Sequence, residues 1–194
     1  MRLAINFVMS NEDWESAIAY AVEAERLGVD MAWTFETWGY DAATPLAYLA
    51  AKTTRMQLGT GIMQIGTRTP AMTAMTAMAL ASLSHDRFVL GLGVSGPQVM
   101  EGWHGVRFAR PLQRVRENID IIRMVMRGER LIYHGEIYDL PLPNGEGKAL
   151  ISAAPPRGVN RCPNLKTEMD KSCFCRSQTV RHTRVPAALR CVIA

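Results

Sequence analysis

The first 161 residues of this 194-residue chain contain no cysteine. All four cysteines follow that point, at Cys162, Cys173, Cys175 and Cys191, and none of them forms the C-x-x-C pair that is typical of zinc knuckles. A disulfide framework is typical of secreted proteins, and nothing else in the sequence indicates secretion. Because the spacing of the cysteines does not fit a zinc site, we predict that the chain has no metal site.

Long hydrophobic runs are also absent. The most apolar segments are interrupted by charge, glycine or proline, so none is long enough to span a membrane. The N-terminus turns acidic after about ten residues and lacks the apolar stretch and small-residue cleavage site of a signal peptide. Because 48% of the residues are hydrophobic, the composition is typical of a globular protein. We expect a cytoplasmic protein that does not contact a membrane.

Charge is distributed unevenly along the chain. Residues 1–150 carry 14 Lys and Arg against 16 Asp and Glu, whereas residues 151–194 carry 8 against 2. A basic tail can indicate contact with nucleic acid, but this one contains a single aromatic residue, Phe174, and we predict no such partner. The change in composition predicts a domain over residues 1–157 and a separate tail over residues 158–194.

Four strand-like segments alternate with four helix-like segments in the first domain. The pattern predicts strands at 2–8, 31–35, 56–62 and 88–92, and helices at 14–27, 42–52, 70–83 and 111–127. A small hairpin is expected within residues 131–140. Repeated βα units of about 30 residues imply a parallel sheet, either an open doubly wound sheet or part of a closed eight-stranded barrel.

Glycines gather where the third and fourth predicted strands end. The segment LGLGVSG at residues 90–96 does not match the dinucleotide pattern G-x-G-x-x-G, yet a glycine-rich loop at this end of a parallel strand is where ligands bind. Glycines inside LGTGI, at residues 58–62, indicate a bulge or a close approach to a ligand. Glu36, which lies between two tryptophans after the second strand, is either an acid of raised pKa or an ion-paired loop residue.

Together these segments resemble the bacterial luciferase-like monooxygenase superfamily, and in particular its branch of coenzyme F420-dependent oxidoreductases. The resemblance covers about residues 1–157. It is carried by residues 2–7, 30–84, 110–125 and 140–150, and above all by RFVLGLGVSGPQVMEGWHG at 87–105. It implies an α/β fold, the N-terminal half of a TIM-like (β/α)8 barrel with four βα units, followed by an irregular C-terminal tail.

The resemblance also implies a cofactor, coenzyme F420 or alternatively FMN, at the carboxyl ends of the strands. In this family the third strand ends in a bulge with a non-prolyl cis peptide that backs the cofactor ring. Gly61 and Ile62 match that peptide, and Met63 follows it. The loop after the fourth strand contacts the cofactor, and the residues that match it are Val94, Ser95 and Gly96. The reaction implied is hydride transfer or oxygen insertion on a small organic substrate.

Two residues depart from the pattern of the dehydrogenases in this superfamily. Thr37 stands where some of them carry a catalytic histidine, and Pro97 stands where they carry a glutamate. A mechanism with a histidine base at the end of the second strand is therefore not supported. The candidates that remain for proton transfer are Glu36, Glu101 and His104.

Beyond residue 157 the family continues with four more strands, whereas this chain continues with basic, cysteine-bearing sequence. We interpret residues 158–194 as a non-homologous, disordered tail produced by a frameshifted or truncated reading frame. A half barrel of this kind has open edges at its first and fourth strands, and we predict little activity for it. The alternative is a non-catalytic half barrel that dimerises or acts as an adaptor, since family members are often homo-oligomers.

Overall fold

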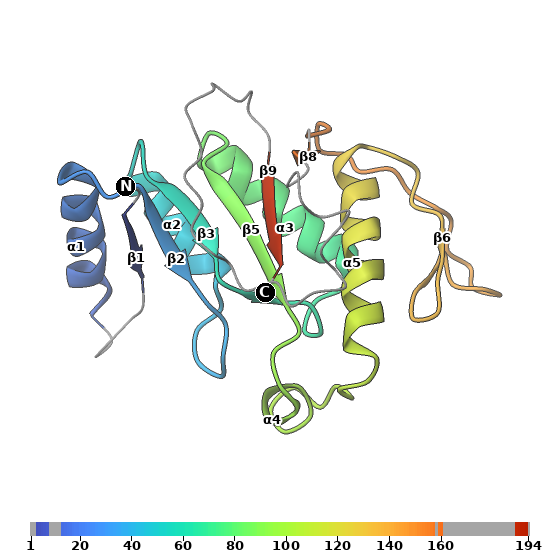
Figure 1. The fold of residues 1–194 in the computed structure, drawn as a ribbon. Coiled ribbons are helices and arrows are strands. Elements are labelled where there is room, and N and C mark those ends of the chain that lie inside the picture. Colours follow the sequence, from blue (N-terminus) through green and yellow to red (C-terminus); the bar gives the residue numbers. More distant parts are fainter. Residues whose placement is uncertain (1–2, 8–12, 158, 161–188, 194) are drawn as a thin grey trace.

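The computed structural model describes residues 3–7, 13–157, 159–160 and 189–193. Four βα units follow one another and build a parallel sheet, with α2 and α3 behind it in Figure 1. The first three units are β1 (Ala4–Asn6) with α1 (Trp14–Arg26), β2 (Met31–Thr34) with α2 (Ala43–Lys52), and β3 (Gln57–Thr60) with α3 (Pro70–Leu83). The fourth unit is β5 (Phe88–Gly93) with α5 (Pro111–Met126). The predicted sequence of βα units is confirmed.

Short polar residues set the starts of the helices. The Asp13 carboxylate accepts a hydrogen bond from the Ser16 main-chain N–H at 3.0 Å and caps α1. Thr69 caps α3 in the same way, and proline occupies the first turn of that helix, where a missing N–H costs nothing. Gly28, with φ of 98°, ends α1 in the left-handed conformation that glycine adopts most readily.

Two strands of the structure lie in the region predicted to be a coil-like tail. β8 (Val159–Asn160) and β9 (Leu189–Ile193) extend the main sheet, whose order is β1-β2-β3-β5-β9-β8. β9 runs parallel to β5, with Val89 opposite Arg190 (Figure 1). The prediction that the fourth strand is an open edge is therefore wrong, because the short run LRCVI satisfies its hydrogen-bonding groups. The predicted disorder and the cysteines at 162, 173 and 175 lie outside the described residues.

The remaining elements are short. β6 (Tyr133–His134) and β7 (Asp139–Leu140) form the expected antiparallel hairpin, and α4 (Pro97–Met100) is one turn of helix that the sequence pattern did not predict.

No helix among the described residues is long and apolar enough to cross a membrane.

The third predicted strand is divided by a bulge. Leu58 of β3 lies opposite Phe88 of β5, and Met63 of β4 (Met63–Gln64) lies opposite Leu92. Between these two pairs, the segment from β3 to β4 holds one residue more than β5. The Thr60 hydroxyl bridges this gap, because it donates to the Gly91 carbonyl at 2.8 Å and accepts from the Gly91 N–H at 2.9 Å. The side chain of Thr60 thus replaces main-chain pairing at the bulge.

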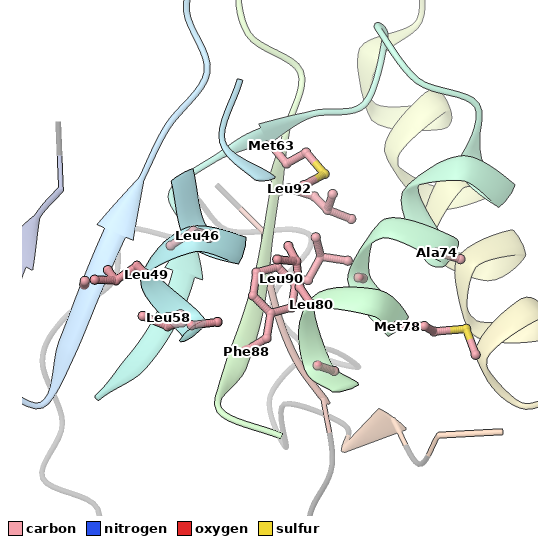
Figure 2. Packing of buried hydrophobic residues seen from close by; sticks show 14 of the residues in the cluster. Leu46, Leu49, Leu58, Met63, Ala74, Met78, Leu80, Phe88, Leu90 and Leu92 are labelled. Atoms are coloured by element: carbon pink, nitrogen blue, oxygen red, sulfur yellow. The ribbon is translucent and has the colours of Figure 1, made fainter. Parts of the chain in front are cut away.

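The hydrophobic core lies between the sheet and helices α2 and α3 (Figure 2). Phe88, Leu90 and Leu92 point from β5 toward α3, and Leu46 and Leu49 approach from α2. Ala74, Ala77 and Ala81 of α3 are buried, and residues this small let the helix backbone approach its neighbours closely. Met78 of the same helix is buried, whereas Met72 and Met75 are 48% and 56% exposed, so only one of these three methionines packs in the core.

A buried carboxylate attaches the hairpin to α5. Glu117, which is 1% exposed, accepts hydrogen bonds from the main-chain N–H groups of Glu136, Ile137 and Tyr138 at 2.9 to 3.0 Å, and from the Gln113 amide at 2.7 Å. Burial raises the pKa of Glu117, but these hydrogen bonds to the ionised form outweigh burial, and the pKa lies below its ordinary value. The charge of Glu117 therefore stabilises the folded chain.

We predict that Gly91→Ala lowers the free energy of unfolding by about 3 kcal/mol, because its methyl group would overlap the Thr60 carbonyl oxygen. Gly39→Ala is the matched control, since nothing lies within 4 Å of a Cβ there, and we expect a change below about 0.5 kcal/mol. Urea denaturation followed by circular dichroism measures both. Equal losses in the two variants would contradict the close approach at the bulge.

A second prediction concerns pH. Because the folded pKa of Glu117 is lowered, its stabilising contribution is complete above the ordinary value of 4.5 and is lost as pH falls through the folded pKa. Glu117→Gln should cost about 2 kcal/mol at pH 7 and should flatten the decline in stability below pH 4.5. Denaturation at a series of pH values tests this, with Glu146→Gln, an exposed carboxylate, as the control. A decline as steep in Glu117→Gln as in the parent chain would refute the assignment.

Candidate functional site

Glu36 follows β2 at the carboxyl edge of the sheet, and its side chain is 8% exposed. One carboxylate oxygen accepts from the Ala42 N–H at 3.2 Å, and the other accepts from the Gln64 N–H at 2.8 Å. The Arg68 guanidinium lies 2.7 Å from the carboxylate. The main-chain N–H of Glu36 also donates to the Ile62 carbonyl at 3.1 Å. Of the two readings that the sequence left open, these contacts favour the ion-paired loop residue.

Asp41 is the second carboxylate beside Arg68. One of its oxygens accepts from the N–H groups of Ala43 and Thr44, both at 3.0 Å, and so caps α2. The same oxygen lies 3.8 Å from the Arg68 guanidinium. Arg68 therefore joins the start of α2, the end of β2 and the segment after β4 in one cluster of charged groups.

The bulge lies directly beside this cluster. The peptide between Gly61 and Ile62 is cis, as the family resemblance implies. The Gly61 N–H donates to the Thr34 carbonyl at 2.6 Å, and the Trp33 indole lies against Gly61 and Gly59. The side chain of Met63 is fully buried in the core beside Leu92 (Figure 2), so any contact of Met63 with a cofactor would use its main chain.

The glycine-rich loop after β5 begins at the same edge. The Ile65 N–H donates to the Gly93 carbonyl at 3.0 Å, which holds the loop against the segment after the bulge. Ser95 adopts φ of 58°, in the left-handed region, and turns the chain into α4. The main-chain N–H groups of Val94, Ser95 and Gly96 make no hydrogen bond to another described residue. The loop therefore offers three adjacent donors.

A cavity of about 280 Å³ opens at the carboxyl edge. Three segments line it, and its lining residues are Glu36, Thr37, Gly39, Tyr40 and Asp41 after β2, Gln64, Thr67 and Arg68 at the end of β4 and beyond it, and Trp103 and His104 after α4. The cavity brings together two of the three predicted proton-transfer residues, Glu36 and His104. Glu101 is not in its lining. This exposed side chain accepts from the Phe108 N–H at 2.9 Å. The six predicted cofactor residues also lie outside the lining.

The sequence analysis did not identify Arg68, Gln64 or Thr60 as part of the site. A signal for Arg68 was present, because it is the one residue among Asp, Glu, Lys and Arg between positions 56 and 85. A lone charge in an apolar stretch needs a partner when it folds into the interior. Gln64 and Thr60 carried no such signal, since their roles depend on contacts with residues about 30 positions away in the sequence.

Residues 2–161 match the family of luciferase-like monooxygenases. The chain belongs to the luciferase-like monooxygenase family. It is 51% identical over 132 residues to a provisionally assigned coenzyme F420-dependent oxidoreductase of Mycobacterium tuberculosis, a match that covers 66% of this chain and 38% of that relative. The chain thus spans well under half the length of this relative.

Solved structures show the same fold. The coenzyme F420-dependent tetrahydromethanopterin reductase of Methanopyrus kandleri matches 71% of this chain and 44% of its own, with a TM-score of 0.64 and 22% identity. The oxygenating constituent of 3,6-diketocamphane monooxygenase from Pseudomonas putida, in complex with FMN, matches 74% and 44%, with a TM-score of 0.63 and 21% identity. The predicted fold class, the N-terminal half of a TIM-like barrel, is confirmed.

We predict that Glu36→Gln lowers the free energy of unfolding by about 3 kcal/mol, because it leaves the Arg68 guanidinium largely buried without its closest carboxylate. Glu101→Gln should change stability by less than about 1 kcal/mol, since Glu101 is exposed and accepts one hydrogen bond. Thermal and urea denaturation of both variants checks the difference. If Glu36→Gln proved as stable as Glu101→Gln, the structural role of Glu36 would be wrong.

Proposed function

We propose that this chain forms the cofactor-binding half of an oxidoreductase that uses coenzyme F420, with FMN as the alternative. The observation that carries the proposal is the bulge between β3 and β4, which lies beside the glycine-rich loop after β5 at the carboxyl edge of the sheet. Ligands of parallel α/β barrels bind at this edge. The F420-dependent relative at 51% identity favours F420 over FMN.

The residues present fit a flat ring system with an oxygen-rich substituent. Gly61 is exposed, so a ring can approach its main chain on the side that the Trp33 indole does not cover. The N–H groups of Val94, Ser95 and Gly96, which donate to no other described residue, are suited to carbonyl or phosphate oxygens. Such a cofactor supplies two-electron chemistry, either hydride transfer or, with reduced flavin, reaction with oxygen.

The chain's own groups have separate tasks in this proposal. Glu36 and Arg68 hold the bulge in place. The Glu36 carboxylate accepts from the Gln64 N–H and pairs with the Arg68 guanidinium, so it is occupied within the fold. His104 is exposed in the cavity wall and is the candidate for moving a proton to or from a small substrate. Glu101 is a weaker candidate because it lies outside the cavity lining. We propose that the protein acts in the cytoplasm and that this polypeptide by itself turns over little substrate.

One observation favours the alternative, a non-catalytic half barrel. β9 pairs with the edge of β5 that would otherwise lie next to the fifth barrel strand. A chain that covers this edge with its own C-terminal residues can persist without the second half of a barrel. In that case the chain acts as a binding module and not as an enzyme.

We predict saturable binding of F420 to the purified chain, about tenfold tighter than the binding of FMN. The loop donors suit both ligands, but the relative at 51% identity is an F420-dependent oxidoreductase. Gly96→Val should weaken binding by about tenfold, because it places a branched side chain among the three donors. Equilibrium dialysis measures these affinities. Gly147→Val is the control, since a side chain there meets open space. Absence of binding by both cofactors would refute the proposal.

A further inference from the structure

The cavity at the carboxyl edge has a lining distinct from the predicted cofactor residues, although it adjoins them through Glu36. We propose that this cavity is a substrate site for a small neutral or cationic molecule that carries a hydroxyl or amino group on a flat apolar body. As a statement about substrate, this inference rests on the proposed function. As a statement about binding, it depends on the cavity alone.

Asp41 supplies the first argument. Its side chain is 38% exposed and lines the cavity. Its Oδ2 accepts from the main-chain N–H groups of Ala43 and Thr44, whereas its Oδ1 accepts no hydrogen bond from another described residue. A ligand O–H or N–H in the cavity can donate to this charged oxygen. The cavity therefore favours ligands with a donor group.

Charge supplies the second argument. Two carboxylates, Glu36 and Asp41, share one guanidinium, Arg68, at 2.7 and 3.8 Å. With histidine counted as neutral, the cavity carries one net negative charge. Both carboxylates lie within 4 Å of the Arg68 guanidinium, so its positive charge is compensated and attracts a phosphate or a carboxylate only weakly. An anionic ligand would meet the excess negative charge, whereas an ammonium group would be attracted to it.

The aromatic wall supplies the third argument. Tyr40 and Trp103 line the cavity, with 53% and 64% of their surface exposed. Trp14 packs edge-on against Tyr40 at 5.2 Å between ring centroids and supports that ring. Exposed aromatic faces beside polar groups bind flat apolar bodies and cations. The volume of about 280 Å³ limits the ligand to a small molecule.

Four one-ring probes test these arguments on the full chain without cofactor: benzylamine, benzyl alcohol, toluene and benzyl phosphate. Ligand-observed NMR titration gives each affinity. We expect benzylamine and benzyl alcohol to bind, toluene to bind about tenfold more weakly for lack of a donor, and benzyl phosphate not to bind. Toluene or benzyl phosphate binding as well as benzyl alcohol would overturn the proposal, as would failure of all four probes to bind.

Matched variants assign the binding to this cavity. Trp103→Ala should weaken binding of benzyl alcohol by about tenfold. Trp38→Ala should leave it within about twofold, because Trp38 is 65% exposed but does not line the cavity. Equal effects of the two variants would overturn the assignment.

Asp41→Asn tests the charge argument, since asparagine retains the capping of α2. It should reduce the preference for benzylamine over benzyl alcohol by about fivefold, and an unchanged preference would count against the proposal. The outcome is separable from that of the cofactor titration. Probe binding in the expected order without F420 or FMN binding would support the cavity and refute the cofactor; F420 binding without probe binding would do the reverse.

Discussion

The carboxylate of Glu36 is the constraint on which the carboxyl edge of the sheet depends. A carboxylate that is 8% exposed needs hydrogen-bond donors around it, and here they come from Ala42, Gln64 and Arg68. Ala42 precedes α2, Gln64 follows the bulge, and Arg68 follows β4. Satisfying one carboxylate therefore fixes the end of β2 relative to the start of α2 and to the segment from Gln64 to Arg68.

The opposite end of the sheet is held by a different kind of contact. Arg87 donates to the carbonyls of Ala50, Thr53 and Met56, and Glu25 accepts from the N–H groups of Arg55 and Met56. These contacts join helix ends to strand starts and lie outside the cavity that Glu36 lines. The two ends of the sheet thus differ as they do in barrel enzymes, in which one end provides stability and the loops of the other end carry the site.

Local sequence patterns predicted the helices well and the bulge incompletely. α3 begins and ends where expected because Thr69, Pro70 and Ser84 act within one helical turn. The strand predicted at 56–62 is broken because Thr60 pairs through its side chain with Gly91, a contact 31 residues away. Gln64 and Arg68 joined the site for the same reason, since their partners lie beyond β2. β9 escaped detection because five apolar-rich residues in a basic segment carry no periodicity of their own.

The position of the loop after α4 follows from one packing contact, and that contact bears on the chemistry. Met100 is 3% exposed and lies so close to Gly66 that any side chain at Gly66 would overlap it. Gly66 follows the bulge, so Met100 attaches the loop that carries Trp103 and His104 to the same segment that Glu36 holds. The Glu36 carboxylate is occupied by its hydrogen bonds and by its ion pair with Arg68, whereas His104 lines the cavity without such a partner among the described residues. In our proposal the mobile proton therefore belongs to the α4 loop and the fixed charge to the end of β2.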